Sequence, residues 1–293
     1  MPAELSLGPG FFEGLETLRR RLAPRVSSGL VGSHMSTRRG QGHAFEAHRA
    51  YAPGDDLRRL DWSTLARSDE PMVKVFRADE DVEVRVLIDC SASLEGAKFE
   101  HILRLTAGLG YLALSAGERL SLRRTAAPFT PCSARPLRGR EGVSSLVSLL
   151  RSLDVAAPSA CHDAVMALAA MRPGVMVLLT DGLEEGPLTT AIAHAGARGH
   201  DVRVVQVLSH DELSPPPGDV VELEDAETGA CVTVTLDAAT LGGYLSRLAG
   251  LCNGLRRAAL GAGGAYLRSG PGEAIDAALV RLIDRAIDPE VAS

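Results

Sequence analysis

One carboxylate and two hydroxyls follow an apolar segment of the chain at alternate positions. The segment is residues 84–88 (VRVLI), and it runs directly into Asp89-Cys90-Ser91-Ala92-Ser93. Hard oxygen ligands on a tight loop suit Mg²⁺, which takes few protein ligands and keeps several waters. The loop has no histidine pair and no nucleophile with a matching base. This pattern predicts metal-assisted binding rather than catalysis.

A second acidic strand end lies at Asp181, which follows the apolar segment 174–180. In an open parallel sheet, ligands bind outside the carboxyl ends of the strands, near the point where the strand order reverses. If strands 82–89 and 174–180 are neighbours, Asp89 and Asp181 lie at the same crevice. The predicted metal ligands are therefore Asp89, Ser91, Ser93 and Asp181, with Mg²⁺ as the ion and Mn²⁺ or Ca²⁺ as alternatives.

Strand and helix patterns alternate between residues 81 and 210. Predicted strands cover 82–89, 119–126, 174–180 and 202–208, and predicted helices cover 97–116, 141–153, 162–171 and 187–199. Strands separated by helices indicate βαβ units and a parallel sheet that is covered on both faces. The predicted fold class is therefore α/β, with a doubly wound, mostly parallel, Rossmann-type sheet.

The rest of the chain lies before and after these βαβ units. Residues 1–79 open with a predicted helix near 10–23 and are expected to pack on a main domain of residues 80–293. An acidic turn between two apolar segments predicts an inserted β-hairpin at about 219–236. A helix at 238–260, a short strand at 264–268 and a helix at 272–286 follow, and the last two could complete the same sheet.

Composition excludes several classes of protein. The formal charge is −6 and no basic cluster resembles a nucleic-acid tail, so no nucleic-acid partner is expected. The five cysteines are scattered and form no CxxC pair, which fits a reduced compartment. No signal-peptide pattern is present, and no apolar stretch reaches the ~18 residues of a spanning helix. We expect a cytoplasmic protein with no membrane span.

The two acidic strand ends resemble the metal-ion-dependent adhesion site of von Willebrand factor A domains. The motif is Asp89-x-Ser91-x-Ser93, followed much later by the turn at Asp181. The resemblance implies direct metal contacts from the two serines and contacts through water from the two aspartates. It also implies a Thr contact from an intervening loop and an acidic side chain from a partner protein that completes the shell.

The intervening loop departs from that pattern, because residues 158–164 (PSACHDA) contain no Thr. Ser159 could substitute if the loop is shifted, and Asp163 could supply an anionic oxygen. A metal-free site therefore remains an alternative.

The N-terminal region carries a long run of charged, aromatic and turn-forming residues, which include Arg49, Tyr51, Gly54, Asp55, Asp56, Arg58, Asp61, Trp62 and Arg67. This run closely resembles the hallmark of the domain-of-unknown-function 58 family. This resemblance implies a von Willebrand factor A-like domain and a MoxR-type AAA+ ATPase as a partner, in chaperone-like maturation of a complex. The alternating charges suit paired, partly buried contacts, and the bulk of Trp62 is expected to anchor the segment against the main domain. The hallmark could instead form a surface that faces a partner.

The predicted function is a non-enzymatic protein-interaction module with a metal-ion-dependent adhesion-type site. Under this hypothesis, Asp89→Ala removes Mg²⁺-dependent partner binding and leaves the fold intact. The alternatives are a Mg²⁺-dependent phosphatase-like enzyme that uses Asp89, and a metal-free structural scaffold with a degenerate site. Ser91 stands where such phosphatases need a second acid, which weighs against the enzyme.

Overall fold

The computed structural model describes residues 7–26, 44–52, 60–68, 71–77, 83–125, 131–155, 158–183, 187–218, 220–226 and 229–284. The chain divides into two compact units. Unit 1 comprises Met1–Gly32 and Val82–Ser293, and unit 2 comprises Ser33–Asp81.

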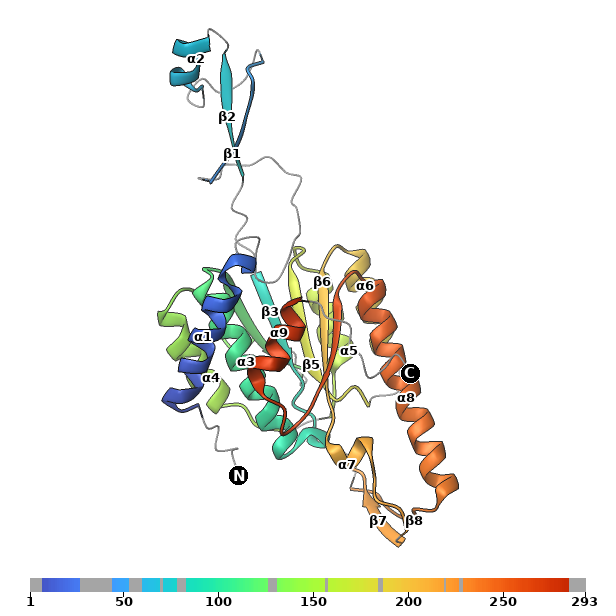
Figure 1. Cartoon of the computed structure of the whole chain (residues 1–293). Coiled ribbons are helices and arrows are strands. Elements are labelled where there is room, and N and C mark those ends of the chain that lie inside the picture. Colours follow the sequence, from blue (N-terminus) through green and yellow to red (C-terminus); the bar gives the residue numbers. More distant parts are fainter. Residues whose placement is uncertain are drawn as a thin grey trace. The chain divides into compact units, whose positions relative to one another are not determined.

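A five-stranded parallel sheet forms the centre of unit 1 (Figure 1). Its strands are β3 (Glu83–Ile88), β4 (Arg119–Arg124), β5 (Val175–Thr180), β6 (Asp201–Val207) and β9 (Ala265–Ser269), in the order β4-β3-β5-β6-β9. The chain passes from β3 to β4 on one side and then returns to place β5 on the other side of β3. The strand order therefore reverses between β3 and β5, and their carboxyl ends flank the switch point.

Helices cover both faces of this sheet (Figure 1). One face packs against α1 (Pro9–Val26), α3 (Ala97–Ser115), α4 (Glu141–Arg151) and α9 (Ile275–Asp284), and the other against α5 (Cys161–Ala169), α6 (Leu188–Ala197) and α8 (Ala238–Gly261). Successive residues of a strand point to opposite faces. Val86 and Ile88 of β3 accordingly join the first core, whereas Leu87 joins the second, and all three are fully buried. This double burial explains why β5 is apolar at every position up to Thr180.

The predicted α/β fold is confirmed, because each predicted strand and helix of residues 81–210 lies within a few residues of an observed one. The segment after residue 260 also completes the sheet as predicted, since β9 pairs with β6 in parallel. The predicted hairpin is present as β7 (Val220–Glu224) and β8 (Cys231–Thr235), which form a separate antiparallel sheet. A short helix, α7 (His210–Leu213), connects β6 to this hairpin.

Unit 2 contains β1 (Ala44–Ala50), α2 (Trp62–Ser68) and β2 (Met72–Arg77), with β1 and β2 paired antiparallel. The predicted division at residue 79 groups the N-terminal helix with the hallmark region and packs both on the main domain. Helix α1 belongs to unit 1, because Leu15, Leu18 and Leu22 are buried in the core that contains α3 and α9. The periodicity of α1 showed an apolar stripe but not the element against which that stripe packs.

Candidate functional site

Asp89 follows β3 and is almost completely buried, with 1% of its surface exposed. Its Oδ1 accepts hydrogen bonds from the Ser91 amide (3.0 Å) and the Thr125 hydroxyl (3.2 Å). Its Oδ2 accepts from the Thr180 hydroxyl (2.6 Å) and the Cys161 thiol (3.3 Å). A buried carboxylate is costly unless its oxygens are hydrogen-bonded. Asp89 meets that requirement with four donors from the protein itself, which indicates that it holds the strand ends together.

The Asp89 loop takes its shape from local hydrogen bonds. The contact from the Ser91 amide to Asp89 Oδ1 is an Asx turn, which ends the strand and turns the chain. Ser91 occupies the N-cap position of the short 3₁₀ helix Ala92–Leu94 without a side-chain capping bond, and the Leu94 side chain is fully buried. These contacts direct Ser91 and Ser93 to the same edge of the sheet, where their hydroxyl oxygens lie 3.1 Å apart.

Asp181 lies at the end of the neighbouring strand β5, and its Oδ2 accepts a hydrogen bond from the Ser93 hydroxyl (2.7 Å). The Lys98 ammonium lies 3.4 Å from the same oxygen. Burial raises the pKa of Asp181, and the Ser93 hydrogen bond and the Lys98 charge act against that rise. The structure therefore brings together Ser91, Ser93 and Asp181, as the sequence predicted, and adds a lysine.

Lys98 connects the site to α7. Its ammonium donates a 2.7 Å hydrogen bond to Glu212 Oε1, and the Lys98 side chain is only 10% exposed. Glu212 is held in place by a capping box with Ser209, in which the Glu212 carboxylate accepts from the Ser209 amide (2.6 Å). The backbone carbonyl of Glu212 accepts a further hydrogen bond from Tyr244 of α8 (2.9 Å). Lys98 thus bridges the carboxylate of Asp181, at the end of β5, and the carboxylate of Glu212, in the segment that leads to the hairpin.

The turn after β5 is fixed by Thr180 and Gly182. The Thr180 hydroxyl accepts from the Gly182 amide (2.9 Å) while it donates to Asp89. Gly182 has a φ of +62°, and a Cβ there would collide with Leu255. A non-glycine residue is therefore disfavoured both by the backbone conformation and by the lack of space.

The intervening loop contributes the Cys161 thiol, which donates to Asp89. Burial raises the pKa of the Cys161 thiol well above its usual range, so it is a neutral donor to Asp89. The Ser159 side chain hydrogen-bonds Cys161. Asp163 is exposed and pairs with its neighbour His162 at 2.9 Å. The roles of Ser159 and Asp163 as metal ligands stay predictions.

The donor set suits a divalent cation in its chemistry and spacing. Neighbouring ligands of an octahedral Mg²⁺ ion lie about 2.9 Å apart, given bonds of about 2.1 Å. The observed separations are 3.1 Å between Ser91 Oγ and Ser93 Oγ and 2.7 Å between Ser93 Oγ and Asp181 Oδ2. In the described part of the chain, no cluster of three or more His, Cys, Asp or Glu residues could hold a metal.

Sequence reasoning missed Lys98, Glu212, Thr125 and Cys161. Two of these residues, Lys98 and Glu212, could have been suspected from the sequence. Lys98 lies in the first turn of α3, where a positive charge is disfavoured by the helix dipole, so another role could have been suspected. The Ser209-x-x-Glu212 spacing is a capping box that is visible in the sequence. Thr125 and Cys161 had no such signal, because only the sheet brings them to Asp89.

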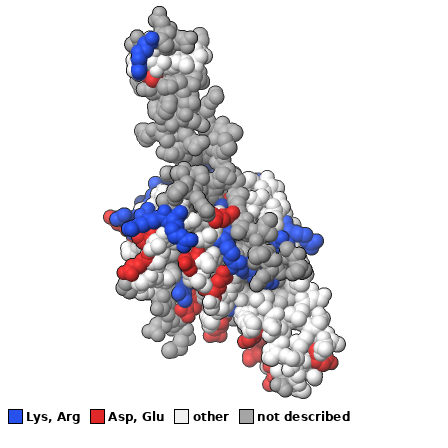
Figure 2. All heavy atoms as spheres, viewed as in Figure 1, with Lys and Arg blue, Asp and Glu red and all other residues white. Residues whose placement is uncertain are grey.

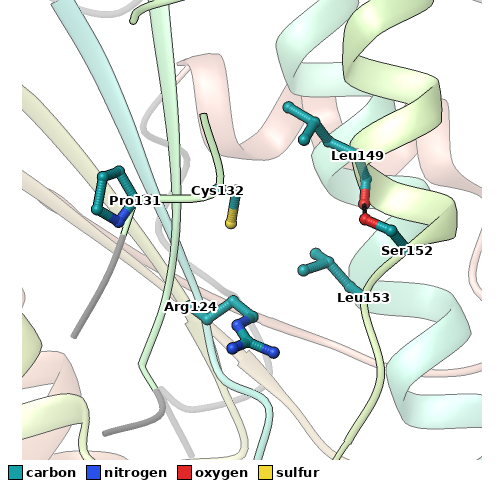
Figure 3. Close-up of a pocket in the computed structure, with 6 residues that line it drawn as sticks. All are labelled: Arg124, Pro131, Cys132, Leu149, Ser152 and Leu153. Carbon is teal, nitrogen blue, oxygen red and sulfur yellow. Dashed lines mark hydrogen bonds between the residues drawn. The ribbon is translucent and has the colours of Figure 1, made fainter. Parts of the chain in front are cut away.

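A shallow pocket of about 220 Å³ lies at the end of β4, outside this site. Figure 3 shows Arg124 and Cys132 on one side and Leu149, Ser152 and Leu153 on the other. Arg124 lies 3.8 Å from Asp154, and burial raises the pKa of the Cys132 thiol. No residue of the predicted metal site lines this pocket.

The described hallmark residues perform structural tasks within unit 2. Asp61 caps α2, because its Oδ1 accepts from the Ser63 amide (3.1 Å) and hydroxyl (2.7 Å). Arg67 donates to the Ser63 carbonyl (3.0 Å). Trp62 is 64% exposed, and its role as an anchor against the main domain stays a prediction. The Arg49 side chain, Gly54, Asp55, Asp56 and Arg58 lie outside the described residues, and Tyr51 is half-buried.

The fold and the polar groups at the carboxyl ends of β3 and β5 define a class of protein. This class is a doubly wound α/β domain with polar groups at its topological switch point. A family model described as "Protein of unknown function DUF58" matches residues 47–247, and the chain belongs to this family. The predicted resemblance is therefore confirmed. Within the described residues, none of the helices has the length and apolar character that crossing a membrane requires.

Curated relatives extend the match beyond the family model. The uncharacterized proteins Mb1516 of Mycobacterium bovis and Rv1480 of Mycobacterium tuberculosis are each 30% identical over 244 residues, which cover 79% of this chain and 75% of theirs. Among solved structures, the chain is similar to the conserved hypothetical protein BatB from Bacteroides thetaiotaomicron (18% identity, TM-score 0.49, 70% of this chain and 96% of that one). It is also similar to an aerotolerance-related membrane protein from Bacteroides fragilis (17% identity, TM-score 0.46, 70% and 98%).

Proposed function

We propose that this chain is a protein-interaction module that binds its partner at the C-terminal edge of the five-stranded sheet. In this proposal Ser91, Ser93 and Asp181 hold a divalent cation, Mg²⁺ or alternatively Mn²⁺ or Ca²⁺. Such a cation supplies an electrophilic centre that can accept a carboxylate from a partner protein. The observation that carries the proposal is the convergence of three hard oxygen donors from two adjacent strand ends.

The non-enzymatic part of the proposal is supported by the state of Asp89. A phosphatase of the alternative type needs an aspartate oxygen that can attack a substrate. Asp89 is 1% exposed, and each of its oxygens already accepts two hydrogen bonds. Its geometry therefore suits a structural role better than a nucleophilic one.

Calorimetric titration with Mg²⁺, Mn²⁺ and Ca²⁺ tests the cation. Wild-type protein should bind at least one of them, and Ser93→Ala and Asp181→Asn should each weaken binding by about tenfold or more, since each removes one ligand. Asp163→Asn is the matched control, because Asp163 is exposed and lies outside the cluster. A wild-type titration without binding heat, or equal loss in Asp163→Asn, would contradict the cation proposal.

Lys98 favours a second candidate function, a metal-free scaffold. Its ammonium lies 3.4 Å from Asp181 and 2.7 Å from Glu212, so a cation of the protein itself already partly compensates these carboxylates. If the titrations show no binding while wild-type protein and Asp181→Asn bind the same partner, the scaffold is the better description.

The partner in this proposal is a MoxR-type AAA+ ATPase, with which the chain would assist chaperone-like maturation of a complex. Membership of the family supports this proposal. Purified chain and ATPase should form a complex in size-exclusion chromatography, with and without nucleotide. EDTA and Asp181→Asn should both reduce its yield if the cation mediates contact, and an unchanged yield in both would contradict that role.

A further inference from the structure

The β7–β8 hairpin belongs to the most one-sidedly charged part of the sequence. Residues 211–246 contain eight Asp and Glu residues and no Lys or Arg. The hairpin follows β6 and α7 and precedes α8, so it projects from the C-terminal side of the sheet (Figure 1). In Figure 2, this end of unit 1 shows acidic and uncharged residues but no Lys or Arg on the visible face.

The two faces of the hairpin differ sharply in chemistry. Residues directly opposite each other in an antiparallel pair share a face, and the pairs are Val221 with Val234 and Leu223 with Val232. These four residues form the apolar ribbon face. The opposite face carries Val220, Glu222, Glu224, Cys231, Thr233 and Thr235. The alternation of sequence types therefore produces one apolar and one mainly polar side.

The outer half of the apolar ribbon face is open to solvent. Leu223 is 48% exposed and Val232 is 56% exposed, whereas Val221 and Val234 are half-buried. Neither exposed residue belongs to the buried core clusters of the described chain. A two-stranded ribbon is marginally stable alone, so a segment that covers this apolar face would stabilise it.

We propose that the apolar ribbon face binds an amphipathic segment of a partner protein that carries Lys or Arg at its margins. Apolar side chains of that segment would cover Leu223 and Val232, and its basic residues would be attracted by the net negative charge of residues 211–246, of which Glu222 and Glu224 lie on the opposite face of the ribbon. The net charge of this part of the chain disfavours a second copy of itself and an anionic lipid surface, because both would bring like charges together. This surface is separate from the cation site, and neither depends on the other.

Fluorescence anisotropy with three labelled peptides tests the proposal: alternating Val and Lys, alternating Val and Glu, and alternating Ser and Lys. The Val/Lys peptide should bind the full chain more tightly than both others, because it alone offers both apolar contacts and complementary charge. Val232→Ser should weaken its binding by about tenfold, since it removes an apolar contact from the centre of the interface. Asp181→Asn should leave it unchanged.

Val220→Ser is the matched control, because Val220 is 68% exposed but lies on the opposite face. It should change the affinity by less than about twofold. Equal weakening by Val220→Ser and Val232→Ser, or equal binding of the Ser/Lys and Val/Lys peptides, would overturn the proposal. A dimer in sedimentation equilibrium that Val232→Ser dissociates would overturn it in favour of self-association. Val232-dependent binding to phosphatidylglycerol vesicles would overturn it in favour of a membrane surface.

Discussion

At the C-terminal edge of the sheet, polar groups are buried and bonded to one another, whereas on the β7–β8 ribbon apolar groups are left in solvent. Asp89 is 1% exposed and accepts four hydrogen bonds. Leu223 and Val232 keep about half of their surface exposed. The edge is therefore expected to contribute to folding as well as to binding. The ribbon is expected to contribute to binding alone, and substitutions in the two regions should separate these roles.

The largest effect is expected for Asp89→Ala, which should lower the free energy of unfolding by about 3–5 kcal/mol. The substitution leaves the Thr125 and Thr180 hydroxyls and the Ser91 amide without their buried acceptor. The expectation from sequence that the fold remains intact is thus not supported by this burial. Urea unfolding measures the effect, with exposed Asp163→Ala as the control. A loss of unfolding free energy below about 1 kcal/mol would show that the hydrogen bonds to Asp89 do not stabilise the fold.

Lys98→Met should lower the free energy of unfolding by about 2 kcal/mol, because it removes charged hydrogen bonds to two partly buried carboxylates. It should also strengthen Mg²⁺ binding, since the ammonium no longer competes for Asp181. Exposed Arg151→Met serves as the control for loss of a positive charge. If Mg²⁺ affinity falls in Lys98→Met, the lysine does not compete with the cation.

His101 makes the free energy of unfolding depend on pH. Burial lowers the pKa of His101 to about 4, with Arg104 acting in the same direction and Glu273 opposing it, and its Nε2 lies 2.8 Å from Ser269 Oγ. The unfolded chain therefore takes up a proton near pH 6.5, before the folded chain does, and stability falls as the pH drops towards 4. Between pH 7 and pH 5, wild-type protein should lose about 1–2 kcal/mol more than His101→Gln in urea unfolding. Equal losses in both proteins would contradict the assignment.

The smallest effect on stability is expected for Leu223→Ser on the ribbon. Its side chain is about half exposed, so the free energy of unfolding should change by less than about 0.5 kcal/mol. Thermal unfolding of this variant beside Leu87→Ala, which empties a fully buried position of β3, measures the contrast. A loss in Leu223→Ser that approaches that of Leu87→Ala would mean that the ribbon is part of the core.

The sequence by itself determined the elements and the fold class. The apolar strands, the helical periodicities and the acidic turn of the hairpin are local patterns, and each corresponds to an observed element. The positions of Asp89 and Asp181 also followed, because residues that end parallel strands meet at the same edge of the sheet.

Only the tertiary structure decided how that edge is completed. Lys98 and Glu212 are separated by 114 residues, and Cys161 reaches Asp89 across 72, so no local pattern could pair them. Tertiary packing also assigned α1 to the core of unit 1. The physical reason is the same in each case: periodicity reports which face of an element is apolar, but not which distant element packs against it or which polar groups meet there.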